Sequence, residues 1–288
     1  MARFVTLNLW SYNDPHDYTV RRGITRGAVP GSPAATRPAT GRSWPIRREL
    51  VVNLLRKAQP DVVGLQEVAT HPAVEDGRNA AAQIADALGW SMLHARDDGP
   101  VEADGRVNGL AIISPHPLRE MACLPLPDRG GRDDRRCLVA EALTSEGPLI
   151  FMTTHFALAG SVTEERAVRD ESVRRILAFC RSLPRGVPLV LCGDLNSVPS
   201  LRPIRCLTGA ESIGGERGAF RDAGSVATGT AIATMPSQEP VVAIDYVLVQ
   251  NAGILDCRAA GAPDAEGYFP SDHLGLVADL DLSGCATG

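Results

Sequence analysis

Residues 187–199 read Val-Pro-Leu-Val-Leu-Cys-Gly-Asp-Leu-Asn-Ser-Val-Pro and predict a strand that ends in a polar turn. An apolar run of strand length leads into a glycine, the carboxylate of Asp194, the carboxamide of Asn196 and a proline. A buried strand that presents such groups at its end is a common way to hold a polar site on a rigid support. Asp and Asn are also ordinary turn residues, so this stretch alone leaves a structural turn as an equal alternative.

Polar residues recur at the ends and starts of other predicted strands. In an antiparallel pair the end of one strand neighbours the start of the next, so all these places can share one edge of the sheets. Turn chemistry alone readily supplies Gly, Pro, Asn and Asp, but less readily a glutamate and two histidines. The strand ends carry Asn8, Glu67, His155, and Asp194 with Asn196, and the strand starts carry Asp245 and Asp272 with His273.

The order of elements predicts a mixed α/β architecture. A helix is expected to start at Ser43-Trp44-Pro45 and to bury a stripe of apolar residues before Pro60. A second is expected over residues 78–88, closed by Gly89, and a third after a capping box of Ser161 and Glu164. The stripe of the first helix is Ile46, Leu50, Leu54, Leu55 and Ala58, and that of the third is Val168, Ser172, Val173, Ile176, Leu177 and Cys180.

Strands are expected between and after these helices, several of them joined as hairpins. The order is not a regular βαβ alternation, which favours mixed or antiparallel sheets with helices packed outside. Residues 22–43 contain almost no large apolar side chain and predict a long loop or flap. The expected strands are 4–9, 61–67, 90–95, 108–114, 137–143, 148–154, 187–192, 241–249 and 274–282.

Composition indicates a globular protein with a sizeable core. The chain has 288 residues, of which 44% are hydrophobic, and a formal net charge of −5. An acidic balance argues against broad electrostatic capture of nucleic acid, although it leaves room for a local basic groove. The seven cysteines are scattered without a CxxC pair, and no signal peptide or membrane-length apolar run occurs. We therefore expect reduced thiols and a cytoplasmic protein.

The types of polar residue indicate phosphoester chemistry. Glu67 and an aspartate offer the hard oxygen ligands that Mg²⁺ prefers, with Mn²⁺ as the alternative. The sequence contains neither HExxH nor a cysteine set, so a structural or proteolytic zinc site is not expected. Two histidines, each oriented by a carboxylate, can position or protonate a phosphate. Metal, carboxylate base and histidine together suit in-line attack of water on phosphorus.

Six short motifs, in their order along the chain, resemble those of the endonuclease/exonuclease/phosphatase (DNase I-like) superfamily. The resemblance extends from about Phe4 to Leu282. It implies a single domain over 1–288, a four-layer α/β sandwich of two mixed, mainly antiparallel sheets, and a Mg²⁺-dependent phosphoesterase site at one edge. The motifs are Thr-Leu-Asn8, Leu-Gln-Glu67, Thr-Thr-His155, Gly-Asp194-Leu-Asn196, Ile-Asp245-Tyr and Ser-Asp272-His273.

The resemblance also implies a role for each residue. Glu67 would be the principal metal ligand, and Asn8 and Asp272 would bind or support the metal. Asp194 would orient or deprotonate the attacking water. Asn196 would bind the phosphate, and His273 would contact it, with its tautomer fixed by Asp245. His155 would assist the leaving group. The residues implied to contact the substrate are Asn8, Asn108, Asn196 and His155.

One departure concerns Trp10, which stands where abasic-site endonucleases of this superfamily have an acidic residue. A second metal contact would be lost there, which disfavours an abasic-site endonuclease. His71, His94 and His116 lie outside the motifs, and we expect no role for them. Arg135 and Arg136 are expected to be solvated loop charges.

Three functional hypotheses follow. The first is a phosphoesterase of a small-molecule or lipid-derived phosphomono- or phosphodiester. The second is a nuclease on DNA or RNA with the same machinery, and the third is a non-catalytic scaffold of the same fold. The nuclease would need a basic groove, for which the flap offers Arg21, Arg22, Arg26, Arg37 and Arg42.

Overall fold

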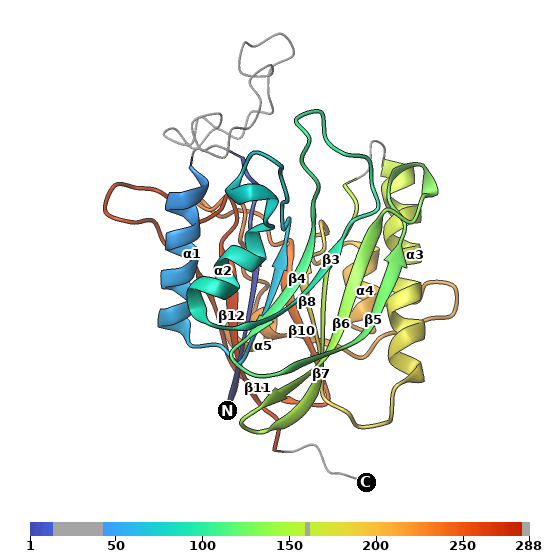
Figure 1. Ribbon diagram of the computed structural model, residues 1–288. Coiled ribbons are helices and arrows are strands. Elements are labelled where there is room, and N and C mark those ends of the chain that lie inside the picture. Colours follow the sequence, from blue (N-terminus) through green and yellow to red (C-terminus); the bar gives the residue numbers. More distant parts are fainter. Residues whose placement is uncertain (14–42, 159–161, 284–288) are drawn as a thin grey trace.

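Two six-stranded β-sheets lie face to face, and helices cover the outer face of each sheet (Figure 1). The computed structural model describes residues 1–13, 43–158 and 162–283. The four layers confirm the expected α/β sandwich. The flap expected at 22–43, with its arginines, lies outside the described residues except for Ser43, and Ser161 of the expected capping box also lies outside them.

The first sheet is built around β1 (Ala2–Asn8), which is parallel to one neighbour, β2, and antiparallel to the other, β12. All other neighbouring strands of this sheet are antiparallel. β1 is buried on both faces, which explains its nearly continuous apolar sequence. In sheet order the strands are β11 (Gly253–Ala260), β12 (Gly275–Asp281), β1, β2 (Val62–Gln66), β4 (Gly109–Ser114) and β3 (Ser91–Arg96).

The second sheet has one parallel pair, β7 with β8, and is otherwise antiparallel. In this register the last residue of β8, Asp194, lies opposite His155 on one side and Asp245 on the other. Three chemically active residues thus meet at one end of adjacent strands. In sheet order the strands are β5 (Leu118–Leu126), β6 (Arg135–Thr144), β7 (Gly147–His155), β8 (Leu189–Asp194), β10 (Asp245–Gln250) and β9 (Arg221–Asp222).

Four helices, α1 to α4, cover the sheets from outside. α1 and α2 pack on the first sheet, and α3 and α4 pack on the second (Figure 1). Among the described residues, no helix combines the length and apolar character that crossing a bilayer requires. The helices are α1 (Trp44–Ala58), α2 (Ala80–Leu88), α3 (Val162–Ser182), α4 (Arg202–Leu207) and α5 (Ala223–Thr228), with short 3-10 turns η3 (Glu75–Gly77) and η4 (Arg129–Gly131).

Local signals explain where α2 begins and ends. The side chain of Asn79 accepts a hydrogen bond from the amide of Ala82 at 2.7 Å, and Gly89 closes the helix with φ of 72°. The capping role expected of Glu164 before α3 involves Ser161 and stays a prediction. The Glu164 carboxylate accepts a hydrogen bond from the amide of Gly130 at 2.8 Å.

The expected buried stripe of α1 was wrong in part. Ile46 is 47% exposed, and Leu50 and Leu54 are only partly buried. The stripe was chosen from apolar residues alone, whereas the true buried face includes an arginine. That face consists of Trp44, Arg47, Val51, Val52 and Leu55.

Three strands at the sheet edges, β5, β11 and the two-residue β9, were not expected from the sequence, and the strand predicted from residue 241 begins only at Asp245. β5 and β11 are edge strands with many partly exposed residues, so they lack the apolar alternation that marks a strand. The other expected strands are present, with their ends shifted by a few residues.

The interior between the sheets is mainly apolar but also contains polar links from one sheet to the other. The rings of Phe4 and Phe151 stack across it with centroids 5.9 Å apart. Nearer the edge of the sheets where β1 and β8 end, the side chain of Gln66 donates to the hydroxyl of Thr153 at 2.8 Å. A Cβ on Gly64 would lie 2.5 Å from the sulfur of Cys192, so glycine permits the close approach of the sheets there.

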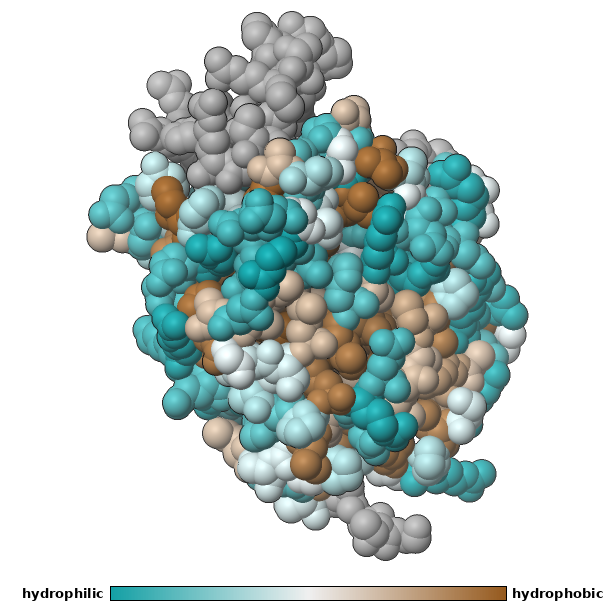
Figure 2. Space-filling view, in the orientation of Figure 1, coloured by the Kyte–Doolittle hydropathy of each residue, from teal (hydrophilic) through white to brown (hydrophobic). Residues whose placement is uncertain are grey.

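The sandwich is closed on one side by the edge strands β3 and β5, which contact each other. Figure 2 shows this face: hydrophilic residues cover most of it, and hydrophobic residues gather near its centre. β1 rises from the N-terminus at the bottom of Figure 1, so its end at Asn8 lies at the upper edge.

Candidate active site

The expected site residues meet at one edge of the two sheets, around a cavity of about 580 Å³. Asn8 and Asp245 do not line the cavity but lie directly behind residues that do. The geometric part of the sequence prediction, that these groups share one place, is confirmed. The expected residues that line the cavity are Glu67, Asn108, His155, Asp194, Asn196, Asp272 and His273.

Asp194 occupies the centre of the site. Its Oδ2 lies 3.5 Å from Nε2 of His155 and 3.9 Å from Nε2 of His273, and it accepts a hydrogen bond from the Asn8 amide at 3.1 Å. Its Oδ1 accepts a hydrogen bond from the backbone amide of Asn196 at 2.9 Å. Burial, and then the nearby Asp245, raise the pKa of Asp194 to about 7.

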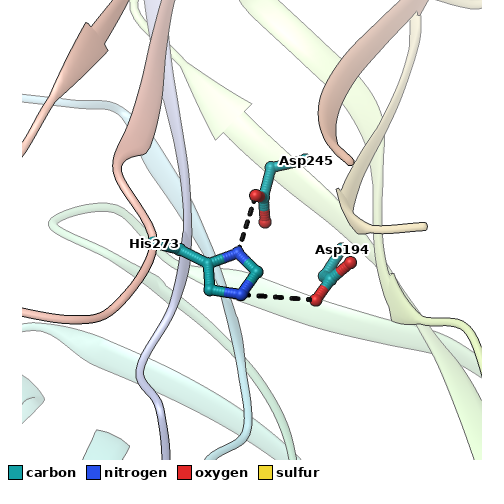
Figure 3. A group of neighbouring side chains, drawn as sticks. All are labelled: Asp194, Asp245 and His273. Atoms are coloured by element: carbon teal, nitrogen blue, oxygen red, sulfur yellow. Dashed lines mark hydrogen bonds and ion pairs between the residues drawn. The ribbon is translucent and has the colours of Figure 1, made fainter. Parts of the chain in front are cut away.

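His273 is held by a carboxylate. Its Nδ1 lies 2.8 Å from Oδ2 of Asp245, while its Nε2 faces Asp194 (Figure 3). The hydroxyl of Thr234 donates to the same Asp245 oxygen at 2.5 Å. Burial lowers the pKa of His273, but Asp245, Asp194 and Asp272 outweigh that effect and raise the pKa well above its ordinary value. The geometry therefore favours an imidazolium at this position.

His155 has the opposite environment. Its Nδ1 lies 3.4 Å from Nη1 of Arg135, and its Nε2 lies 3.1 Å from the side-chain nitrogen of Asn196. That Asn196 nitrogen also donates to the carbonyl of Phe156 at 2.9 Å. Burial, then Arg135 and His273, lower the pKa of His155 well below its ordinary value. This imidazole is therefore favoured in its neutral form.

The expectation that Arg135 and Arg136 are solvated loop charges was wrong. Arg135 lines the cavity, with its side chain 20% exposed, and donates to Asp128 at 2.9 Å. It also lies 3.5 Å from Asp97. Arg136 is 12% exposed and forms an ion pair with Asp98. The carboxylates of the neighbouring loops offset the cost of burying both guanidinium groups.

Glu67 lies beside Asn8 at the start of a tight turn. Its Oε1 accepts a hydrogen bond from the Asn8 amide at 3.3 Å, and its Oε2 lies 3.0 Å from the hydroxyl of Ser11. The same hydroxyl lies 2.6 Å from Oδ1 of Asn108. Glu67 and Ser11 both have positive φ, 51° and 47°, which is uncommon for residues with a side chain and often marks functional sites.

A comparison with family models matches residues 5–273 to the model described as "Endonuclease/Exonuclease/phosphatase family". The chain belongs to this family. Its members are generally hydrolases that act on phosphoester bonds and depend on a divalent metal. Among curated proteins, no significant match to the chain was found.

Solved structures with the family fold cover nearly the whole chain. An endonuclease/exonuclease/phosphatase structure from Beutenbergia cavernae is 22% identical, with a TM-score of 0.71, and the match covers 100% of this chain and 73% of that one. The human Nocturnin catalytic domain with bound sulfate is 17% identical, with a TM-score of 0.65, over 97% and 93%. D. rerio TDP2 complexed with a single-strand DNA product is 15% identical, with a TM-score of 0.64, over 97% and 98%. These likenesses confirm the fold.

The donor set at the edge of the family fold suits a hard divalent cation. Glu67, Asp272 and the Asn8 amide supply oxygen atoms, the type that Mg²⁺ and Mn²⁺ prefer. Burial raises the pKa of Asp272 to about 6 against the opposing effect of His273, and Glu67 adds to the rise. A cation between these carboxylates would relieve that repulsion. Asp194, Asp245 and His273 form another close group, in which Nδ1 of the histidine already hydrogen-bonds to Asp245.

Acidic residues dominate the outer part of the cavity among the described residues. They come from the two loops that follow β3 and β5, and two arginines lie between them. Burial raises the pKa of one of them, Asp97, to about 6. The acidic lining residues beyond the central site are Asp97, Glu102, Asp128 and Asp134, and the arginines are Arg132 and Arg135.

Three site residues were missed by sequence reasoning. Ser11 and Thr234 are short hydroxyl residues in loops, and nothing local distinguishes them from other turn residues. The sequence did contain a signal for Arg135, which directly precedes an apolar strand. The resemblance places the site at the ends of such strands. The neighbours of Arg135 in the loop, rich in aspartate and arginine, favoured the solvated interpretation.

Proposed function

We propose that the protein is a divalent-metal-dependent phosphoesterase that hydrolyses a phosphomono- or phosphodiester of a small-molecule or lipid-type substrate. The observation that carries this proposal is the position of Asp194 between two imidazoles and next to Asn8 and Glu67. A base, two histidines and an oxygen-donor set then converge on one cavity, as in-line attack of water on phosphorus needs.

Asp194 is the proposed general base. A pKa of about 7 suits proton transfer from water near neutral pH, because a base is most effective when its pKa lies near the working pH. The amide of Asn8 and the backbone of Asn196 fix the carboxylate in place. The side chain of Asn196 would hold a phosphate oxygen beside it.

The two histidines have different proposed roles. His273, held as a cation by Asp245, would contact the scissile phosphate and stabilise the charge that develops there. His155, held neutral beside Arg135, would hydrogen-bond the leaving-group oxygen. Asn108, fixed by Ser11, lines the cavity and is proposed to contact the substrate.

Glu67, Asn8 and Asp272 are the residues proposed to hold the metal, Mg²⁺ or Mn²⁺. The Oδ1 of Asn8 already accepts a hydrogen bond from Trp10, which leaves its second lone pair for a ligand. A bound divalent cation would supply positive charge that polarises the phosphoryl group.

The acidic outer lining supports a compact substrate rather than a polyanion. A long nucleic acid would bring several phosphates near Asp97, Glu102, Asp128 and Asp134. One observation favours a nuclease, namely the similarity to a TDP2 structure that contains a single-strand DNA product. We keep this as the second candidate. The described cysteines are free thiols, which suits the cytoplasmic location that is part of the proposal.

Hydrolysis of bis(p-nitrophenyl) phosphate and p-nitrophenyl phosphate with Mg²⁺ or Mn²⁺ tests the proposal. We expect activity that EDTA abolishes, and a fall of about 100-fold or more in Asp194→Asn and in His273→Ala. The control is Asp256→Asn, which changes an aspartate with a 52% exposed side chain. Retention of full activity by both site variants would exclude the mechanism.

The same preparation distinguishes the alternatives. A nuclease would cleave single-stranded or plasmid DNA in preference to the small esters, with binding that weakens steeply as salt rises. A non-catalytic scaffold would take up no Mn²⁺ in a titration and hydrolyse none of these compounds.

A further inference from the structure

Arg47 is a fully buried arginine of α1 that lies behind the active edge. Its guanidinium carbon lies 5.2 Å from the ring centre of Trp10 and 5.4 Å from that of Trp44. Burying a guanidinium is costly, and aromatic faces and hydrogen bonds offset part of that cost. An apolar residue would be the ordinary choice at this position of a packed helix.

The guanidinium connects two segments that are far apart in the chain. Nη1 donates to the carbonyl of Leu9 at 2.7 Å and to that of Pro270 at 3.2 Å. Nη2 donates to the carbonyls of Ser11 at 2.7 Å and Asn13 at 3.2 Å. Only the planar, branched arginine head can reach this many acceptors in fixed directions, which a lysine ammonium cannot do.

These two segments carry or support all the proposed metal ligands. In the first, the amide of Trp10 donates to Oδ1 of Asn8 at 2.9 Å, and the hydroxyl of Ser11 lies 3.0 Å from Glu67. In the second, Pro270 lies two residues before Asp272. The loop that Arg47 holds therefore touches two of the ligands, and the other segment carries the third.

We propose that Arg47 is a positioning residue for the metal site: by binding the carbonyls of Leu9, Ser11 and Pro270, it fixes the spacing of Asn8 and Glu67 relative to Asp272. The inference rests on the proposed function, since it concerns those three ligands. Residues that orient metal ligands typically change metal affinity by 10- to 100-fold when they are altered. Arg47 acts through the backbone and does not touch the substrate.

The test is the affinity for Mn²⁺ and Mg²⁺, measured by calorimetry on the full chain. In Arg47→Lys, which keeps the charge but loses the branched head, we expect binding to weaken by about 10-fold or more. At saturating metal, the kcat of Arg47→Lys should lie closer to the wild-type value than its metal affinity does.

Arg3→Lys is the matched control. Arg3 lies at the opposite end of β1, where it donates to the carbonyl of Ala58 at 2.7 Å and pairs with Asp279. It should lower stability without changing metal affinity. Equal affinity in wild type and Arg47→Lys would overturn the inference. An equal loss in both variants would also overturn it, because general destabilisation would then be the cause.

Failure of the proposed function gives a different result, since the wild type itself would then bind no metal. If Arg47→Lys does not fold, nuclear magnetic resonance on the wild type still tests whether Arg47 positions the metal site. Titration with Mg²⁺ should shift the guanidinium signals of Arg47 and leave those of Arg3 unchanged. No change at Arg47 would overturn the inference.

Discussion

At the scale of single residues, the two imidazoles beside Asp194 have environments that shift their pKa values in opposite directions. The far nitrogen of His273 faces the carboxylate of Asp245, and the far nitrogen of His155 faces the guanidinium of Arg135. The pKa of the first is raised and that of the second is lowered. In the proposed mechanism, His273 would therefore offer a cation to a phosphate, and His155 would offer a neutral hydrogen-bonding group.

Asp245→Asn should weaken catalysis strongly, because it removes the charge that keeps His273 protonated. We expect kcat/KM to fall by about 100- to 10,000-fold, the usual contribution of a positioned acid or base. The measurement is the rate with a nitrophenyl phosphoester, with the melting temperature as a check that the fold is intact. A folded variant with wild-type kcat/KM would refute this role for Asp245.

His94 predicts an effect of pH on stability. It lies in β3 outside the site, and its Nε2 is buried without a hydrogen-bond partner among the described residues. Burial lowers the pKa of His94 below its ordinary 6.5. The unfolded chain therefore binds a proton at His94 more readily than the folded chain does. The contribution of the neutral imidazole to the free energy of unfolding is complete above pH 6.5 and is lost as pH falls through the folded-state pKa.

The difference between wild type and His94→Leu isolates this effect. The free energy of unfolding of the wild type should fall relative to the variant below pH 6.5, by at most about 1.4 kcal/mol per pH unit. Denaturant unfolding at several pH values measures it. Parallel pH curves for the two proteins would show that His94 titrates alike in both states.

Single residues also mark how far sequence reasoning reaches. Glu67 and His155 could be predicted because an apolar strand that ends in such a group is unusual. Arg47 could not, since its burial depends on partners 30 or more residues away in the chain. The position of Arg135 before a strand was a signal, but its burial depends on carboxylates of neighbouring loops that the sequence does not place. Charge in a polar loop or on a helix is ordinarily solvated, and only tertiary contacts reverse that expectation.

At the scale of elements, β7 and β8 must approach closely to bring His155 beside Asp194. Gly193 has φ of +139°, and a Cβ there would lie 1.9 Å from the carbonyl oxygen of Thr154 in the adjacent strand. A side chain at this position would separate the strands at the site itself.

Gly193→Ala should therefore destabilise the protein and reduce activity together. Gly147→Ala is the matched control, because Gly147 also has positive φ, 120°, but no atom lies within 4 Å of its added Cβ. We expect Gly193→Ala to cost at least about 2 kcal/mol more in unfolding free energy than the control. Equal costs would show that backbone conformation alone, and not the contact with Thr154, requires glycine.

Elements differed in how well the sequence predicted them. Central strands such as β8 have apolar runs buried on both faces, and their limits were close to those expected. The edge strands β5 and β11 were missed because partial exposure removes the regular pattern. The buried face of α1 was misplaced because Arg47 interrupts its apolar stripe.

At the scale of the whole molecule, the four-layer fold was predicted from the resemblance of six motifs, in their order along the chain, to those of the family. That 1–288 form one catalytic domain stays a prediction, as do the roles of the site residues. A cation bound between Glu67 and Asp272 would stabilise only the folded state.

Thermal unfolding tests both predictions. We expect one transition, raised by about 4–5 °C when Mn²⁺ is present at 100 times its dissociation constant, since this adds about 2.7 kcal/mol. EDTA should reverse the shift, and Asp272→Asn should reduce it. Two separate transitions would contradict the single domain, and a melting temperature indifferent to metal would contradict the site.

The polar link between Gln66 and Thr153 has a consequence for the chemistry above it. One sheet carries Asn8 and its partners, and the other carries Asp194, so every distance across the cavity depends on how the two layers are aligned. A small slide of one layer over the other would pull the base away from the metal side while leaving most of the interior apolar and filled. Substitutions in the interior beneath the cavity should therefore lower the turnover number more readily than they lower the stability of the fold.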